Sequence, residues 1–126
     1  MHADNHASLG DAERALGRLE LALRSYEQAS ALAAPEQCVP VALRQARLLA
    51  EDLGRADDAL EVLDAAFARR PDLRLVVRAG DVLLSAGRPL EALERFESAR
   101  SQRPDDAVLG ARVDAARAAA SEERQR

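Results

Sequence analysis

The chain has no isoleucine, threonine, tryptophan or lysine, and its only aromatic side chains are Tyr26, Phe67 and Phe96. Without isoleucine and threonine, valine is the only β-branched residue that could build strands, and it is scattered along the sequence. Alanine and leucine dominate the 48% of residues that are apolar, and both favour helix. The composition therefore predicts an all-α fold in which small side chains let helices pack closely.

Features of a membrane or nucleic-acid protein are lacking as well. The 18 basic residues are all arginine, which we interpret as the codon bias of a GC-rich, bacterial-like genome. The net charge of −4 gives no general attraction to phosphate backbones or anionic lipid. No stretch approaches the ~20 apolar residues that span a bilayer, and residues 1–10 lack the pattern of a signal peptide. We therefore expect one cytoplasmic domain that binds neither nucleic acid nor membrane, unless the sequence is a fragment of an exported protein.

Catalytic and metal-binding patterns are equally scarce. Cys38 is the only cysteine, so it can form no internal disulfide or cysteine-based zinc cluster, and we interpret it as a half-buried structural thiol between two helices. His2 and His6 have a spacing that can share a metal on a helix, but Asp4 is no adequate third ligand. No phosphate loop or nucleophile elbow is present. The sequence predicts no enzyme, no metal site and no cofactor.

A Gly-Arg pair followed by Ala-Leu occurs three times, beginning at Gly17, Gly54 and Gly87. The copies are 37 and 33 residues apart, close to the ~34-residue period of repeats made of two helices. After each pair, an alanine, a large residue and a second alanine recur at helical spacing, so that they share one face. The three large residues are Tyr26, Leu63 and Phe96.

Glycine and proline divide each copy into a pair of helices. The three glycines follow helical runs, where a left-handed C-terminal residue is expected, and Pro89 can open a helix. Pro35, Pro71 and Pro104 end the copies, and Asp72 or Asp105 can cap the helix that follows. The predicted helix pairs are 4–16 with 19–32, 41–53 with 56–69, and 73–86 with 89–101, in repeats at about 3–35, 40–71 and 72–104.

These features resemble the tetratricopeptide repeat family, which has Leu-Gly in the first helix, alanine and an aromatic residue in the second, and proline at the end. Leu9-Gly10 and Ala79-Gly80 match the first-helix pattern, although the family's usual tryptophan and tyrosine are missing there. The resemblance implies an α-solenoid, a right-handed superhelix of antiparallel helix pairs with about seven helices. The seventh, at 105–120, would be a closing helix with Arg112, Asp114 and Arg117 facing water, followed by a frayed tail at 121–126.

The second repeat has a register problem in its first helix. Counting back from Gly54 puts Arg47 at the crowded position that needs a small residue, whereas Ala46 would fit. We infer one extra residue between Ala46 and Gly54, near Glu51-Asp52, which would turn Arg47 outward into the groove.

The resemblance also implies where a partner would bind. Members of the family generally bind peptides or helices on a concave face lined by the first helix of each pair. Co-chaperones of the family grip a C-terminal carboxylate; Arg74 and Arg78 match part of that clamp by spacing, but Ala7 and Asp11 depart from it. The candidate partner-binding residues are Arg44, Arg47, Leu48, Arg74, Val77, Arg78, Asp81 and Leu84.

Two interpretations of the arginines stay open. Arg44, Arg74 and Arg78 could attract an acidic partner segment, because guanidinium groups bind carboxylates bidentately. Alternatively, they pair with Asp72, Asp81 or Glu51 as solvated surface charge. The leading function is an adaptor or scaffold that binds a peptide or helix of another protein. The alternatives are a self-associating structural repeat protein, which would form a homo-oligomer, and an accessory domain of a longer protein.

Overall fold

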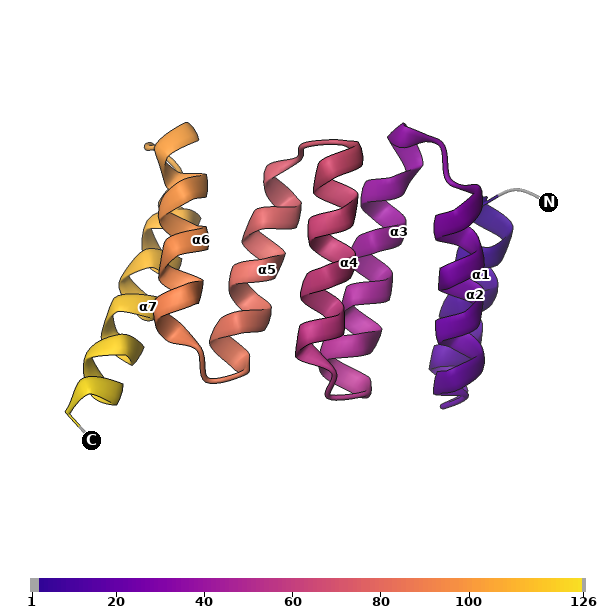
Figure 1. Cartoon of the computed structure of the whole chain (residues 1–126), viewed down its shortest axis with the longest axis horizontal. Coiled ribbons are helices and arrows are strands. Elements are labelled where there is room, and N and C mark those ends of the chain that lie inside the picture. The colour runs from indigo at the N-terminus through magenta and orange to yellow at the C-terminus, as the bar shows by residue number, and fades with distance from the viewer. Residues whose placement is uncertain (1–2, 126) are drawn as a thin grey trace. The chain divides into compact units, whose positions relative to one another are not determined.

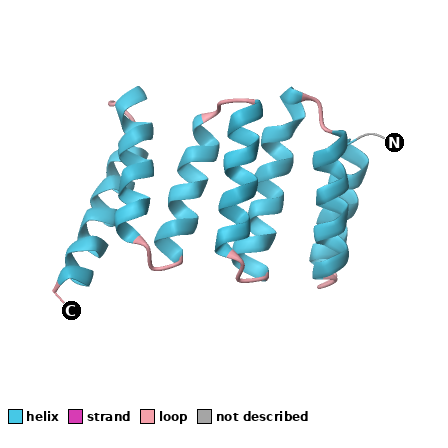
Figure 2. Cartoon of the chain, viewed as in Figure 1, coloured by secondary structure: helices cyan, strands magenta, loops and turns pink. Residues whose placement is uncertain are grey.

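The computed structural model describes residues 3–125, with the side chain of Asp4 excepted, and these residues form helices joined by short turns, without strands (Figure 2). The predicted all-α fold of seven α-helices is confirmed in this range. The elements are α1 (Ala3–Ala15), α2 (Leu19–Leu32), α3 (Pro35–Arg47), the π-helical turn η1 (Leu48–Asp52), α4 (Ala56–Arg69), α5 (Leu73–Ser85), α6 (Pro89–Gln102) and α7 (Ala107–Arg124). The chain divides into two compact units, Met1–Leu75 and Val76–Arg126, which are described separately.

The first unit contains two helix pairs, α1 with α2 and α3 with α4 (Figure 1). It also includes η1 and the first residues of α5, up to Leu75. Alanines at the pair interfaces are almost fully buried, and a cluster of Ala7, Ala29 and Val41 joins α1, α2 and α3. A Cβ atom on Gly10 would lie only 2.7 Å from Cε1 of Tyr26. The predicted small-large-small face therefore lets the backbone of α1 lie directly against the aromatic ring of α2.

The turns between paired helices depend on glycine, as the sequence predicts. Gly17, Gly54 and Gly87 have φ angles of 76°, 65° and 77°, in the left-handed region that side chains with a Cβ avoid. The three Gly-Arg pairs therefore mark the same structural position, the C-terminal end of the first helix of each pair.

The predicted extra residue in the second repeat is accommodated by η1. The N–H of Leu53 donates to the carbonyl of Leu48 at 3.0 Å, a bond spanning five residues rather than four, which is how a π-helical turn absorbs an insertion. Ala46 is fully buried and the side chain of Arg47 is 55% exposed. The prediction of one extra residue that turns Arg47 outward is confirmed.

The predicted start of the first helix in the second repeat is wrong. The helix α3 begins at Pro35, not Val41, and Pro40 lies inside it. Pro35 occupies the first helical position, where its missing N–H costs nothing. The segment expected to be a connection buries Cys38 (3% exposed) and Val39 (1%), and this burial outweighs the interior proline. The Cys38 thiol donates to the Pro35 carbonyl at 3.0 Å.

The second unit contains the rest of α5 together with α6 and α7. Phe96 of α6 is fully buried against Gly80 of α5, where an added Cβ would lie 2.7 Å from Cδ1 of the ring. The helix α7 buries Leu109, Val113, Ala116 and Ala120. It runs to Arg124, four residues beyond the predicted end, so residues 121–124 are helical and not the frayed tail that the sequence predicted.

The start of α7 corrects a capping prediction. The side chain of Asp106, not Asp105, accepts hydrogen bonds from the N–H groups of Val108 (2.9 Å) and Leu109 (3.2 Å). In the first unit Asp72 does cap α5, accepting from the Arg74 N–H at 2.9 Å. A carboxylate at this position satisfies amides that have no partner within the helix.

Candidate functional site

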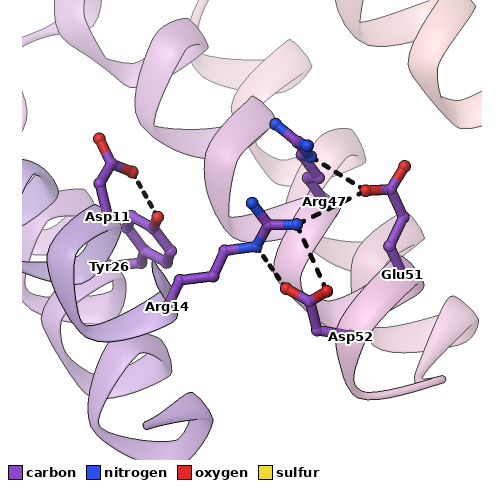
Figure 3. Close-up of polar contacts among 6 residues, drawn as sticks. All are labelled: Asp11, Arg14, Tyr26, Arg47, Glu51 and Asp52. Atoms are coloured by element: carbon purple, nitrogen blue, oxygen red, sulfur yellow. Dashed lines mark hydrogen bonds and ion pairs between the residues drawn. The ribbon is translucent and has the colours of Figure 1, made fainter. Parts of the chain in front are cut away.

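The first helices of the first unit and η1 carry six charged residues that form two groups of ion pairs. Asp11 pairs with Arg44, and Arg14, Arg47, Glu51 and Asp52 form the other group; we call all six the α1–α3 charge network. Arg14 of α1 forms a forked hydrogen bond with the Asp52 carboxylate and lies 3.8 Å from Glu51 (Figure 3). Arg47 also donates to Glu51, through Nε at 2.9 Å. The π-helical turn holds Glu51 and Asp52 opposite Arg14, so the inserted residue contributes to this arrangement.

Tyr26 of α2 contacts the α1–α3 charge network through Asp11. Its hydroxyl donates to Asp11 at 2.5 Å (Figure 3), and Asp11 also lies 3.6 Å from Arg44. Burial of the phenol and then its hydrogen bond to Asp11 raise the pKa of Tyr26 well above its usual range. The hydrogen bond to Asp52 raises the pKa of Arg14. The buried tyrosine therefore helps to set the position of Asp11 on this surface.

The structure separates the candidate residues of α3 and η1 into surface and core. Arg44 and Arg47 have side chains that are 45% and 55% exposed, and both are available to a partner. Leu48 is 0% exposed, so it is a core residue and its assignment as a binding residue is wrong. The π-helical turn that begins at Leu48 shifts the helical phase, and this shift carries the leucine inward.

On α5, Arg74 is bound to a neighbour. Its guanidinium donates to Asp72 at 3.1 and 3.0 Å, which lowers the pKa of that carboxyl. Arg78 lies one helical turn further and is half-buried. Among the residues that the structure describes, Arg78 makes no ion pair or side-chain hydrogen bond. Two arginines of the predicted acidic-partner patch, Arg44 and Arg74, are therefore paired within the chain.

The remaining candidates on α5 are half-buried: Val77, Asp81 and Leu84. Asp81 accepts from Nε and Nη2 of Arg112 at 2.9 and 3.3 Å. Arg112 therefore contacts α5 instead of pointing into water as predicted. Arg117 binds Glu97 of α6 at 3.3 Å but its side chain remains 57% exposed. Like Asp114, it faces water as predicted.

A groove that the sequence reasoning missed lies on the other side of α3, in the first unit. It encloses about 360 Å³ and is lined by residues of α2, α3, η1 and α4, and we call it the α2–α4 groove. Its floor includes Leu23, Ala42 and Leu49, all of them buried. Gln45, also in the groove, and Arg47 are two residues apart and so point ~200° apart around α3. The sequence signal that could have indicated the groove is Gln45 itself. Once the extra residue is counted, this polar residue occupies the position that Ala79 has in the third repeat.

The described part of the chain offers neither a metal cluster nor a membrane span. Within it, no three histidine, cysteine, aspartate or glutamate side chains are placed to hold a metal ion. His2, one of the two histidines considered from the sequence, lies outside the described residues. None of the described helices is long and apolar enough to cross a membrane.

Solved structures resemble this chain over most of its length. A thermophilic TPR protein of Thermus thermophilus, TTC0263, matches 90% of this chain with 29% sequence identity and a TM-score of 0.68, and this chain spans 59% of TTC0263. PcrH, in complex with the chaperone-binding region of PopB, matches with 18% identity, 93% coverage of both chains and a TM-score of 0.64. No protein-family model matches, and no curated protein matches in sequence.

Proposed function

Since the chain has the tetratricopeptide-like repeat fold, we propose that it is a non-enzymatic adaptor that binds a peptide or helix of another protein on the surface of its first helices. The observation that carries this proposal is the α1–α3 charge network. Arg44 and Arg47 are about half exposed, and each lies beside a carboxylate of the same surface: Arg47 donates to Glu51 at 2.9 Å, and Arg44 lies 3.6 Å from Asp11. Arginines restrained in this way lose less conformational freedom when they bind a ligand.

Acidic side chains are the chemistry that these arginines fit best. Arg47 uses its Nε for Glu51, and Arg44 has a single contact, at 3.6 Å, to Asp11. Guanidinium groups have five donors in a planar fork, so both retain donors for a bidentate carboxylate. The fold-level likeness to PcrH, which is in complex with a region of PopB, supports a protein as the ligand class.

A charge-reversal experiment tests the proposal. Partners are captured from a lysate of the native host and identified by mass spectrometry, and the purified partner is titrated against the chain. We expect the Arg44→Glu/Arg47→Glu variant to bind at least tenfold more weakly. The matched control, Arg18→Glu/Arg24→Glu, makes the same charge change at exposed positions of the α2 region and should bind normally. Equal affinity of the two variants would refute binding at this surface.

Self-association is the competing role, and one observation favours it. Leu9 of α1 and Leu16, which directly follows α1, are 50% and 67% exposed, and exposed apolar side chains that lie together can form a contact with a second copy. Size-exclusion chromatography with light scattering distinguishes the two roles. A monomer at micromolar concentration would rule out self-assembly, whereas a dimer dissociated by Leu9→Ser/Leu16→Ser would support it.

A further inference from the structure

The α2–α4 groove holds a buried polar side chain without a partner. Gln45 is 7% exposed, and its amide makes no side-chain hydrogen bond with any residue in the described range 3–125. In the same range, no side-chain polar atom is both fully shielded and unpaired, so the amide keeps a small opening. Gln45 lines the groove, and its free hydrogen-bonding capacity is therefore directed there. A polar ligand group in the groove would give this largely shielded amide a hydrogen-bond partner.

The charges at the rim of the groove leave a negative excess. Arg55 is paired with Asp58 at 2.7 Å, and Arg69 donates to the backbone carbonyls of Ala33 (2.6 Å) and Ser30 (3.4 Å). Glu27 and Glu61, on α2 and α4, are exposed. For these two carboxylates the structure shows no ion pair with any described residue. The groove thus has two carboxylates to offer to a cation.

We propose that the α2–α4 groove binds an arginine side chain of a partner protein. The aliphatic stem fits the apolar floor of Leu23, Ala42 and Leu49, while the guanidinium donates to the Gln45 amide oxygen and to Glu27 and Glu61. Arginine is favoured over lysine because its planar fork supplies five donors to several acceptors and is more weakly hydrated. This site lies on the opposite side of α3 from the α1–α3 charge network and is independent of the adaptor proposal.

An NMR titration with small probes tests the site on the intact chain. N-acetyl-arginine amide is added to ¹⁵N-labelled protein, with N-acetyl-lysine amide and the neutral N-acetyl-norleucine amide as comparison probes. We expect the arginine probe to shift the side-chain amide resonances of Gln45 and the backbone resonances of the groove residues, with weaker effects from the other two. Equal effects from norleucine or lysine would overturn the proposal, as would shifts confined to the α1–α3 charge network.

Matched variants locate the interaction. Glu27→Gln/Glu61→Gln should weaken binding of the arginine probe about fivefold, since two exposed ion pairs are lost. Gln45→Leu, which replaces the amide by an apolar side chain of similar size, should weaken it as well. The control Glu122→Gln/Glu123→Gln removes the same charge from exposed positions of α7 and should leave the affinity unchanged. Unchanged affinity in the groove variants would contradict the proposal even if the wild-type protein binds the probe.

Discussion

Gly80 of α5 lies directly against the ring of Phe96, so closely that a methyl group on its Cα would sit 2.7 Å from the Cδ1 atom of the ring. We expect Gly80→Ala to lower the free energy of unfolding by up to ~2 kcal/mol, because an overpacking cost of ~1–3 kcal/mol is only partly offset by the ~1 kcal/mol that alanine gains in helix propensity. Urea denaturation followed by circular dichroism measures the difference.

Gly110 of α7 provides the matched control in the same unit. An added Cβ there meets nothing within 4 Å, so only the propensity term remains. Gly110→Ala should raise the free energy of unfolding by up to ~1 kcal/mol. If both substitutions change stability in the same direction, the close contact between Gly80 and Phe96 is not what selects glycine.

The features that the sequence predicted correctly are those set by residues near one another in the chain. Repeated spacing gave the bounds of α2 and α4 and the left-handed turns, because these depend on residues near each other in the chain. The mismatch at Arg47 even revealed the insertion, since three copies must put a small residue in the same place.

Other features depend on contacts that no local pattern encodes. Local proline rules placed the start of α3 after Pro40, but burial of Cys38 and Val39 decides it. The burial of Leu48 depends on where in the helix the extra residue is accommodated, because the π-helical turn changes which side chains face the core. Nor did spacing alone show that Gln45 lies unpaired in a groove, because the groove walls come from α2 and α4.

The titration of Tyr26 should be shifted to high pH. Its pKa is raised by burial and by the hydrogen bond to Asp11, so the folded state retains a proton that the unfolded state loses near pH ~10. The stabilisation from this shift is fully present below the unfolded pKa and is lost as pH rises above it. Because the chain has one tyrosine, tyrosinate absorbance reports this group alone.

Asp11→Asn should move the Tyr26 titration back toward its usual range without reaching it, because burial, the larger cause, remains. Asp114→Asn, an exposed aspartate of α7, serves as the control and should leave the titration in place. A wild-type tyrosine that ionises at the ordinary pH while the protein is still folded would contradict the burial of Tyr26 and its hydrogen bond to Asp11.

The ion pair between Arg14 and Asp52 should contribute measurably but modestly to stability. Their side chains are 27% and 24% exposed, and pairs at the surface typically contribute up to ~1 kcal/mol. A double-mutant cycle with Arg14→Ala and Asp52→Asn should give a coupling energy of about 0.5–1 kcal/mol that decreases in 1 M salt, at the short screening length expected there. The more exposed pair of Arg117 and Glu97 (57% and 47%) should give a smaller coupling, and the reverse order would show that exposure does not govern these pairs.

The N-terminal cap of α7 should depend on one of two adjacent aspartates. Asp106 accepts two backbone hydrogen bonds at the start of the helix, so Asp106→Ala should lower the free energy of unfolding by about 1 kcal/mol. Asp105→Ala removes the same charge one residue earlier, where no such bond is made, and should have a much smaller effect. Comparing the two variants in urea denaturation separates the hydrogen bonds from the general attraction of the helix N-terminus for negative charge, which both substitutions weaken. Equal destabilisation by the two variants would mean that charge alone, and not the Asp106 cap, stabilises the start of α7.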